Sequence, residues 1–502
     1  MKKIASIVAA LIIFLAILAI PIDPTILAPE AKSVAAVTIL MILLWVTGGI
    51  PLEATALLPL VLFPALGILS PGEVAASYGD QVIFLFLGGF IIAMAMQRWN
   101  LHRRIALHII HIAGTSPRRL ILGFMIATAF LSMWISNTAT AMMMIPIAIA
   151  IILTIIPRTN KELENLSTEE QALARCLIIS IPYAASIGGI ATIIGTPPNG
   201  IFLAQLKTIF PGAPAIDFFT WMKFGVPFAA VFLFLAWLWL TYVPYRRMLK
   251  SLPQAGDIIH DELEKLGPIS VGERWTLVVF VTTAFAWIFA TTKVIGSVTV
   301  PGLDMIFPGI QDSTIAIFGA FLLFILPVDW KRGIFTMNWE WAVKIPWGIL
   351  ILFGGGIALS GGFIQSGLAA SIVSSLTVIH GLPIILLIFV VALAVSLATE
   401  VASNTAMAAV LMPIMAVTAV SMGLNPVILM ITVAVCASMA FMLPVATPPN
   451  AVAYGSGYIT AEDLLRSGWA LDIIGVMLWT VFLLTVVLWA LGITFDLPAW
   501  AL

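Results

Sequence analysis

Charged residues are scarce in this chain of 502 residues: Asp, Glu, Lys and Arg make up 9% of it, whereas hydrophobic residues make up 61%. That balance leaves too little polar surface for a water-soluble globule and is typical of a polytopic membrane protein. A net charge of -1 offers no broad basic surface for nucleic acid. The two cysteines, Cys176 and Cys436, both lie in apolar segments, so neither a disulfide framework nor a metal site is indicated.

Catalytic motifs are missing as well. The five histidines form no His-Glu-x-x-His pair, and no Gly-x-Ser-x-Gly elbow occurs. We therefore expect no enzyme. A channel stays open as an alternative, although the closed, duplicated hairpins described below favour a carrier.

Apolar runs long enough to cross a bilayer as helices recur along the chain. They lie near residues 4–21, 34–50, 52–69, 81–97, 174–206, 224–243, 276–295, 313–328, 346–364, 426–456 and 470–492. Two further stretches, 120–156 and 382–422, are each interrupted midway by polar residues and are predicted to be re-entrant hairpins. The predicted fold class is an all-α polytopic membrane protein with about 11 transmembrane helices and two re-entrant hairpins.

The distribution of basic residues supports this count. With a cytoplasmic N-terminus, nineteen of the 23 Lys and Arg residues fall in cytoplasmic segments, and the exceptions are Lys32, Lys207, Lys223 and Lys293. If either hairpin were a single crossing, every later segment would be reversed and these charges would be scattered. The first hairpin is therefore expected to open from the cytoplasm and the second from outside, in a multi-pass protein of the cell membrane.

Two polar phrases each occur twice. Ser136-Asn137-Thr138 is repeated as Ser403-Asn404-Thr405 at an offset of 267 residues, and Thr196-Pro197-Pro198-Asn199 as Thr447-Pro448-Pro449-Asn450 at an offset of 251. The polar insertion at 157–171, present after the first hairpin only, accounts for the difference. Each copy spans five crossings plus a hairpin. Because five is odd, the copies must be inverted, as in many secondary transporters.

These phrases suit the binding of an anion together with cations. Helix N-termini beside a break offer free N–H groups to an anion, and broken ends offer carbonyl oxygens to a small cation. The carboxamides of Asn137 and Asn404 can turn oxygen to a cation and nitrogen to a carboxylate. The alternative is that the polar residues merely cap the hairpin turns, which two matched copies make less favourable.

The twin motifs, together with the stretch NLHRRIAL at 100–107, resemble the divalent-anion:sodium symporter family, whose members carry dicarboxylates, citrate or sulfate. The resemblance covers essentially the whole chain. It implies an elevator-type homodimer. Its scaffold would comprise 1–118 (spans 1–4) and 275–366 (spans 7–9), and its transport domain 119–157 (hairpin 1), 172–245 (spans 5–6), 380–424 (hairpin 2) and 425–502 (spans 10–11).

The resemblance also implies site residues and Na⁺ as the coupling ion. The first sodium site would use Ser132, Ser136, Asn137 and Gly195, and the second would use Thr399, Ala402, Asn404 and Ala446. Substrate carboxylates would meet Asn137, Thr138, Thr196, Pro197, Asn404, Thr405, Thr447 and Pro448.

The charged residues near the motifs indicate which substrate and which coupling ion to expect. Neither motif pair contains Lys or Arg, so sodium and helix ends must compensate the substrate's charge, which suits a C4 dicarboxylate such as succinate, malate or fumarate. Glu400 lies three residues before Ser403, where the first copy has Met133. An ionisable residue at membrane depth is a functional candidate. Proton coupling, or exchange of dicarboxylates, citrate or sulfate, is therefore the alternative to sodium symport.

Overall fold

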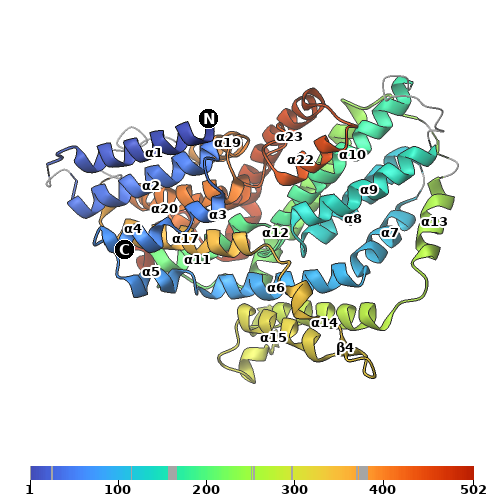
Figure 1. Ribbon diagram of the computed structural model, residues 1–502, viewed down its shortest axis with the longest axis horizontal. Helices are drawn as coiled ribbons and strands as arrows, with labels where there is room; N and C mark the ends of the chain where they lie inside the picture. The colour runs from blue at the N-terminus through green and yellow to red at the C-terminus, as the bar shows by residue number, and fades with distance from the viewer. Residues whose placement is uncertain are drawn as a thin grey trace.

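The structure is a computed structural model that describes residues 2–23, 27–114, 116–155, 167–249, 251–252, 255–295, 298–368, 371 and 383–502. It is predominantly helical (Figure 1). Among the described residues, eight helices are long and apolar enough to cross a membrane, and six shorter apolar helices accompany them. The predicted eleven crossings therefore stay a prediction. Most of the insertion at 157–171 and the first residues of the predicted second hairpin, 380–382, lie outside the described residues.

The first half of the chain forms thirteen labelled helices within the described residues. They are α1 (Lys2–Ala19), α2 (Pro29–Thr47), α3 (Leu52–Thr55), α4 (Leu58–Ala65), α5 (Pro71–Ser77), α6 (Gln81–Arg98), α7 (Leu101–Ala113), α8 (Pro117–Ser132), α9 (Asn137–Ile155), α10 (Thr168–Ile190), α11 (Pro197–Ile209), α12 (Phe218–Tyr242) and α13 (Ala255–Lys265). The predicted span over 52–69 corresponds to two short helices, α3 and α4, separated by a turn at Ala56 and Leu57, with Pro59 in the first turn of α4.

The second half contains the remaining helices and the strands. The helices are α14 (Val271–Ile288), α15 (Asp312–Ile325), α16 (Trp339–Ala342), α17 (Trp347–Gln365), α19 (Ile384–Thr399), α20 (Asn404–Ser421), α21 (Pro426–Cys436), α22 (Pro448–Gly455), α23 (Ala461–Phe482) and α24 (Leu488–Leu491). A π-helical turn, Leu483–Val487, joins α23 to α24. The all-α prediction missed two antiparallel pairs, β1 (Lys293–Ile295) with β2 (Val298–Val300) and β3 (Pro327–Asp329) with β4 (Ile334–Phe335).

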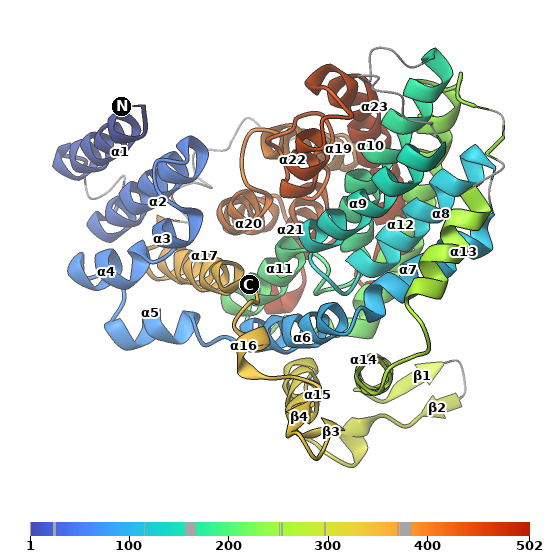
Figure 2. The ribbon, with the colours of Figure 1, turned by 45° about the vertical axis from the view of Figure 1, so that its right-hand side comes forward.

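The two repeats interlock at the centre of the molecule. Helix α22 of the second copy packs against α9 and α10 of the first, while α11 of the first copy packs against α20 and α21 of the second. Figure 2 shows these helices gathered between the N-terminal helices α1–α5 and the group formed by α7, α8, α12 and α13. Each copy therefore completes the packing of the other, as a two-fold relation between the repeats requires.

Glycines bring several of these helices into close contact. A Cβ atom on Gly88 in α6 would lie 2.4 Å from the carbonyl carbon of Ala316 in α15, and one on Gly355 in α17 would lie 2.5 Å from the carbonyl oxygen of Ala56. No real side chain fits at such distances. The paired glycines thus serve close helix packing, which is their usual role in membrane proteins.

The arginines of the stretch at 100–107 tie α7 to the segments that follow the first repeat. Arg104 Nε lies 2.8 Å from Glu273 Oε1 in α14, and Arg103 pairs with Glu262 in α13. Glu262 also accepts a hydrogen bond from Lys265, which with Arg103 holds the pKa of its carboxyl below the usual value. These ion pairs link residues more than a hundred positions apart.

Candidate functional site

Each Ser-Asn-Thr phrase lies at a junction between two helices. Helix α8 ends at Ser132 and α9 begins at Asn137, and in the second copy α19 ends at Thr399 and α20 begins at Asn404. The two helices on either side of each junction contact one another. In both copies the motif Asn is therefore the first residue of the second helix, where backbone N–H groups are left free by the helix itself.

The Asn137 side chain lies within a cluster of oxygen atoms. One atom of its carboxamide is 2.6 Å from Ser132 Oγ and 3.2 Å from the carbonyl oxygens of both Ala185 and Gly195. If that atom is the nitrogen, it donates to all three oxygens. If it is the oxygen, four oxygen atoms face one another, and a small cation bound among them would satisfy them all.

This cluster contains three of the four residues predicted for the first sodium site, Ser132, Asn137 and Gly195, together with Ala185, which the sequence did not indicate. The fourth residue, Ser136, accepts a hydrogen bond from Ala139 N at 3.4 Å, which is a helix cap. Ser136 therefore acts as a helix cap, whereas Ser132 contacts the Asn137 side chain and caps no helix N-terminus. The position of the Ala185 carbonyl oxygen carried no sequence signal, because a backbone carbonyl can come from any residue type.

The second copy has a matching arrangement around Asn404. Thr399 Oγ1 lies 2.6 Å from Asn404 Oδ1 and 3.0 Å from the carbonyl oxygen of Ala437. Thr399 is fully buried, as Ser132 is in the first copy. The other two predicted residues, Ala402 and Ala446, can contribute backbone atoms only. Ala446 N donates to the Leu443 carbonyl oxygen at 3.2 Å, which shapes the turn just before α22.

The Thr-Pro-Pro-Asn phrases begin the short helices α11 and α22 after each break, with Pro at the first helical position. Their Asn residues fasten the breaks in the same way. Asn199 Nδ2 donates to the carbonyl oxygens of Gly189 and Thr192 at 3.3 and 2.8 Å. Asn450 Nδ2 donates to those of Ala440 and Leu443 at 3.2 and 3.1 Å. Both carboxamides thus replace hydrogen bonds that the interrupted helix cannot make.

The breaks are held to the motif junctions by different chemistry in the two copies. In the first, Thr192 Oγ1 donates to the carbonyl oxygen of Met133. In the second, the carboxylate of Glu400, at the position equivalent to Met133, accepts from Met442 N at 2.8 Å and Leu443 N at 2.9 Å. Glu400 is only 2% exposed, so it is paired locally rather than pointing into an aqueous vestibule.

A second buried carboxyl group, Asp472 of α23, lies beside Glu400 and was not among the predicted site residues. Asp472 is 1% exposed, and it lies close to Ser396 and the backbone of Phe441 as well as to Glu400. Its position inside the apolar run 470–492 was the available signal, because an ionisable residue within a predicted span is a functional candidate.

The two halves of the predicted substrate site meet. Thr196 Oγ1 lies 3.2 Å from Ser438 Oγ, so the break of the first copy touches that of the second. The motif residues Asn137, Thr138 and Asn404 are partly exposed, whereas Thr196 and Thr447 are buried. Within the described residues, no Lys or Arg forms an ion pair or hydrogen bond with them.

Polar groups beside paired helix breaks, built into two interlocked repeats, are typical of membrane transporters. Residues 1–493 match the family described as the sodium:sulfate symporter transmembrane region, and the chain belongs to that family. The resemblance drawn from the motifs is thereby confirmed.

Curated relatives and solved structures agree with this assignment. The sodium-dependent dicarboxylate transporter SdcS of Staphylococcus saprophyticus is 40% identical over 484 residues, covering 95% of this chain and 90% of that protein. SdcS of Staphylococcus aureus is 40% identical over 472 residues, covering 93% and 88%.

Two solved structures show a similar fold. Neisseria gonorrhoeae MtrF, described as illuminating a class of antimetabolite efflux pumps, aligns with a TM-score of 0.56 at 12% identity over 84% of each chain. The YdaH transporter of Alcanivorax borkumensis aligns with a TM-score of 0.54 at 14% identity, over 81% of this chain and 84% of that one.

Proposed function

We propose that this protein is a secondary active transporter that couples the inward movement of a C4 dicarboxylate to a sodium gradient. The observation that carries the proposal is the oxygen cluster at Asn137, in which Ser132, Ala185 and Gly195 surround the carboxamide. The corresponding group around Asn404 would form the second sodium site. Sodium ions held there would compensate the charge of the substrate.

The substrate would bind between the two junctions. Its carboxylates would accept hydrogen bonds from the side chains of Asn137, Thr138, Asn404 and Thr405 and from the helix N-termini at the two Thr-Pro-Pro phrases. We prefer a dicarboxylate to sulfate because the two Thr-Pro-Pro phrases each begin a helix, which offers one helix N-terminus to each carboxylate. The names of the relatives at 40% identity support the same choice.

The movement that carries substrate across the membrane would be of the elevator type. The segments 119–157, 172–245, 380–424 and 425–502 would slide as a transport domain against a scaffold made of 1–118 and 275–366. The scaffold would form a homodimer in the cell membrane, with the N-terminus in the cytoplasm. Cross-linking of cysteine pairs placed on the two domains would test the sliding, and mass measurement of the purified protein would test the dimer.

Uptake of labelled succinate into proteoliposomes tests the coupling. Uptake is expected with an inward sodium gradient, with competition by malate and fumarate and weak competition by sulfate. Undiminished uptake in choline with a proton gradient alone would instead establish proton coupling, for which Glu400 and Asp472 would be the first residues to examine. Stronger competition by sulfate would overturn the choice of substrate.

A further inference from the structure

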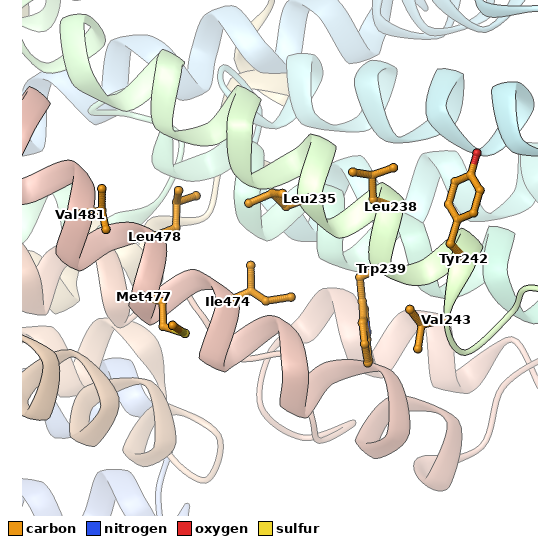
Figure 3. A pocket seen from close by; sticks show the side chains of 9 residues that line it. All are labelled: Leu235, Leu238, Trp239, Tyr242, Val243, Ile474, Met477, Leu478 and Val481. Carbon is orange, nitrogen blue, oxygen red and sulfur yellow. The ribbon is translucent and has the colours of Figure 1, made fainter.

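An apolar groove on the outer face of the molecule lies between α12 and α23. It encloses about 600 Å³ and is lined by nine side chains, all of them apolar or aromatic: Leu235, Leu238, Trp239, Tyr242, Val243, Ile474, Met477, Leu478 and Val481. In Figure 3, Ile474 of α23 projects into the space beneath Leu235 of α12, and Leu478 of α23 lies beside Leu235. Trp239 Nε1 donates to the carbonyl oxygen of Ser467 at 2.9 Å and so fixes the two walls together.

A basic pocket lies next to the end of this groove. It encloses about 560 Å³ and is lined by Ser116, Pro117, Arg118, Glu169, Arg246, Arg247, Met248 and Leu249. Because three arginines and one glutamate line the pocket, its basic side chains outnumber its acidic ones. None of these arginines takes part in an ion pair with another described residue.

Tyr242 connects the groove to the pocket. Its side chain lines the groove, and the guanidinium of Arg118 lies 4.1 Å from the centre of its ring. In Figure 3 the Tyr242 hydroxyl points away from α23. Trp237 Nε1 also donates to the Arg118 carbonyl oxygen at 2.9 Å, which holds the start of α8 against α12. The free N–H groups at that helix start add to the attraction for an anion.

The arrangement matches the dimensions of a lipid in one leaflet. The groove extends over Leu235 to Val243, nine residues that rise about 12 Å along a helix, which is comparable with half of a hydrocarbon core about 30 Å thick. Arg118, Arg246 and Arg247 lie beyond the end of the groove that the positive-inside rule assigns to the cytoplasm. The cytoplasmic leaflet carries the anionic lipids.

We propose that the groove and the pocket together form a binding site for an anionic phospholipid of the cytoplasmic leaflet. The acyl chains lie in the groove between α12 and α23, and the phosphate lies among Arg118, Arg246, Arg247 and the N-terminus of α8. This site is separate from the motif junctions, so its test does not depend on which substrate is carried.

The test measures lipid retention on the purified full-length chain by native mass spectrometry. Phosphatidylglycerol is added in one arm, phosphatidylcholine with the same acyl chains in a second, and inorganic phosphate as a competitor in a third. The wild-type chain is expected to retain phosphatidylglycerol preferentially. Each arginine near the membrane surface contributes a factor of roughly five, so replacing all three by Gln should weaken retention on the order of a hundredfold.

Single variants keep the test decisive if the triple variant does not fold. The exposed Arg247→Gln should weaken retention about fivefold, and Ile474→Trp should lower it by filling the groove. Lys331→Gln, an exposed basic residue on the predicted cytoplasmic side within the β3–β4 turn, is the matched control. Equal retention of phosphatidylcholine, displacement of the lipid by inorganic phosphate, or an equal loss in Lys331→Gln would each overturn the proposal.

Discussion

Replacing Asn137 by Ala should weaken the binding of sodium and of substrate together. The carboxamide contacts Ser132 Oγ at 2.6 Å and the carbonyl oxygens of Ala185 and Gly195 at 3.2 Å, and Ala can contact none of them. A buried hydrogen bond to a charged group contributes roughly 1.5 to 3 kcal/mol. Loss of one such interaction corresponds to about a ten- to hundredfold rise in the apparent dissociation constant.

Both ligands must respond if Asn137 joins them. Sodium and substrate share one coupling free energy, so a variant that loosens their contact lowers each affinity in the presence of the other. The assay is labelled-succinate uptake into proteoliposomes over a range of sodium and substrate concentrations. Asn404→Ala should behave alike, because Asn404 makes the corresponding 2.6 Å contact with Thr399. Asn338→Ala removes a helix cap at α16, and Asn338 contacts neither motif Asn, so the variant should change neither affinity.

The result that would refute this reasoning is loss of substrate affinity in both junction variants while sodium dependence stays unchanged. The motif Asn residues would then bind substrate only, and the sodium sites would have to lie elsewhere.

Three further predictions concern the framework of the site. Gly195→Ala should abolish sodium-stimulated uptake, because a Cβ there would lie 2.4 Å from the Gly189 carbonyl oxygen. Gly455→Ala is the control and should leave uptake unchanged, because a Cβ there would have no atom within 4 Å. Wild-type sodium affinity in Gly195→Ala would contradict this prediction. Glu400→Gln deprives one of the two backbone N–H groups of Met442 and Leu443 of its acceptor, so it should reduce the free energy of unfolding by about 1 to 3 kcal/mol. The thermal unfolding midpoint should fall below that of the control variant Glu30→Gln. Equal midpoints would show that these two hydrogen bonds to Glu400 contribute nothing to stability. Arg104→Ala removes the ion-pair partner of the buried Glu273 and should destabilise the fold by about 3 kcal/mol. Arg332→Ala removes an exposed pair with Asp329 at 3.6 Å and should cost less than about 1 kcal/mol. The denaturant midpoints of the two variants would test the difference.

The sequence was sufficient to locate the helix junctions. Ser-Asn-Thr phrases within apolar runs, and Pro-Pro within others, cannot continue a helix in hydrocarbon without help, so the break positions followed from chemistry. The structure has α9 and α20 beginning at the motif Asn residues, and α11 and α22 beginning at the Pro-Pro steps. The repeat relation was visible for the same reason, because the phrases recur in the same order.

Other features could not be read from the chain. The turn between α3 and α4 gave no hydropathy signal, because its residues Ala56 and Leu57 are themselves apolar. The Arg104–Glu273 pair joins residues 169 positions apart, a separation that no local pattern encodes. The carbonyl oxygen of Ala185 reaches Asn137 only because α10 packs against α8 and α9, which is a matter of tertiary structure.

The two helix breaks are held to their junctions by different hydrogen bonds. This difference affects which conformation an unloaded carrier would prefer. In an alternating-access cycle that exchanges the roles of two inverted repeats, identical repeats would make the inward-open and outward-open forms equally populated in the absence of ligands and membrane potential. Here one break is held by the Thr192 hydroxyl and the other by the Glu400 carboxylate. The repeats therefore differ in their hydrogen bonding at equivalent positions. If the proposed transport cycle holds, the unloaded carrier would favour one face of the membrane. Divergence after gene duplication would in this way set a directional preference that the sodium gradient must work with or against.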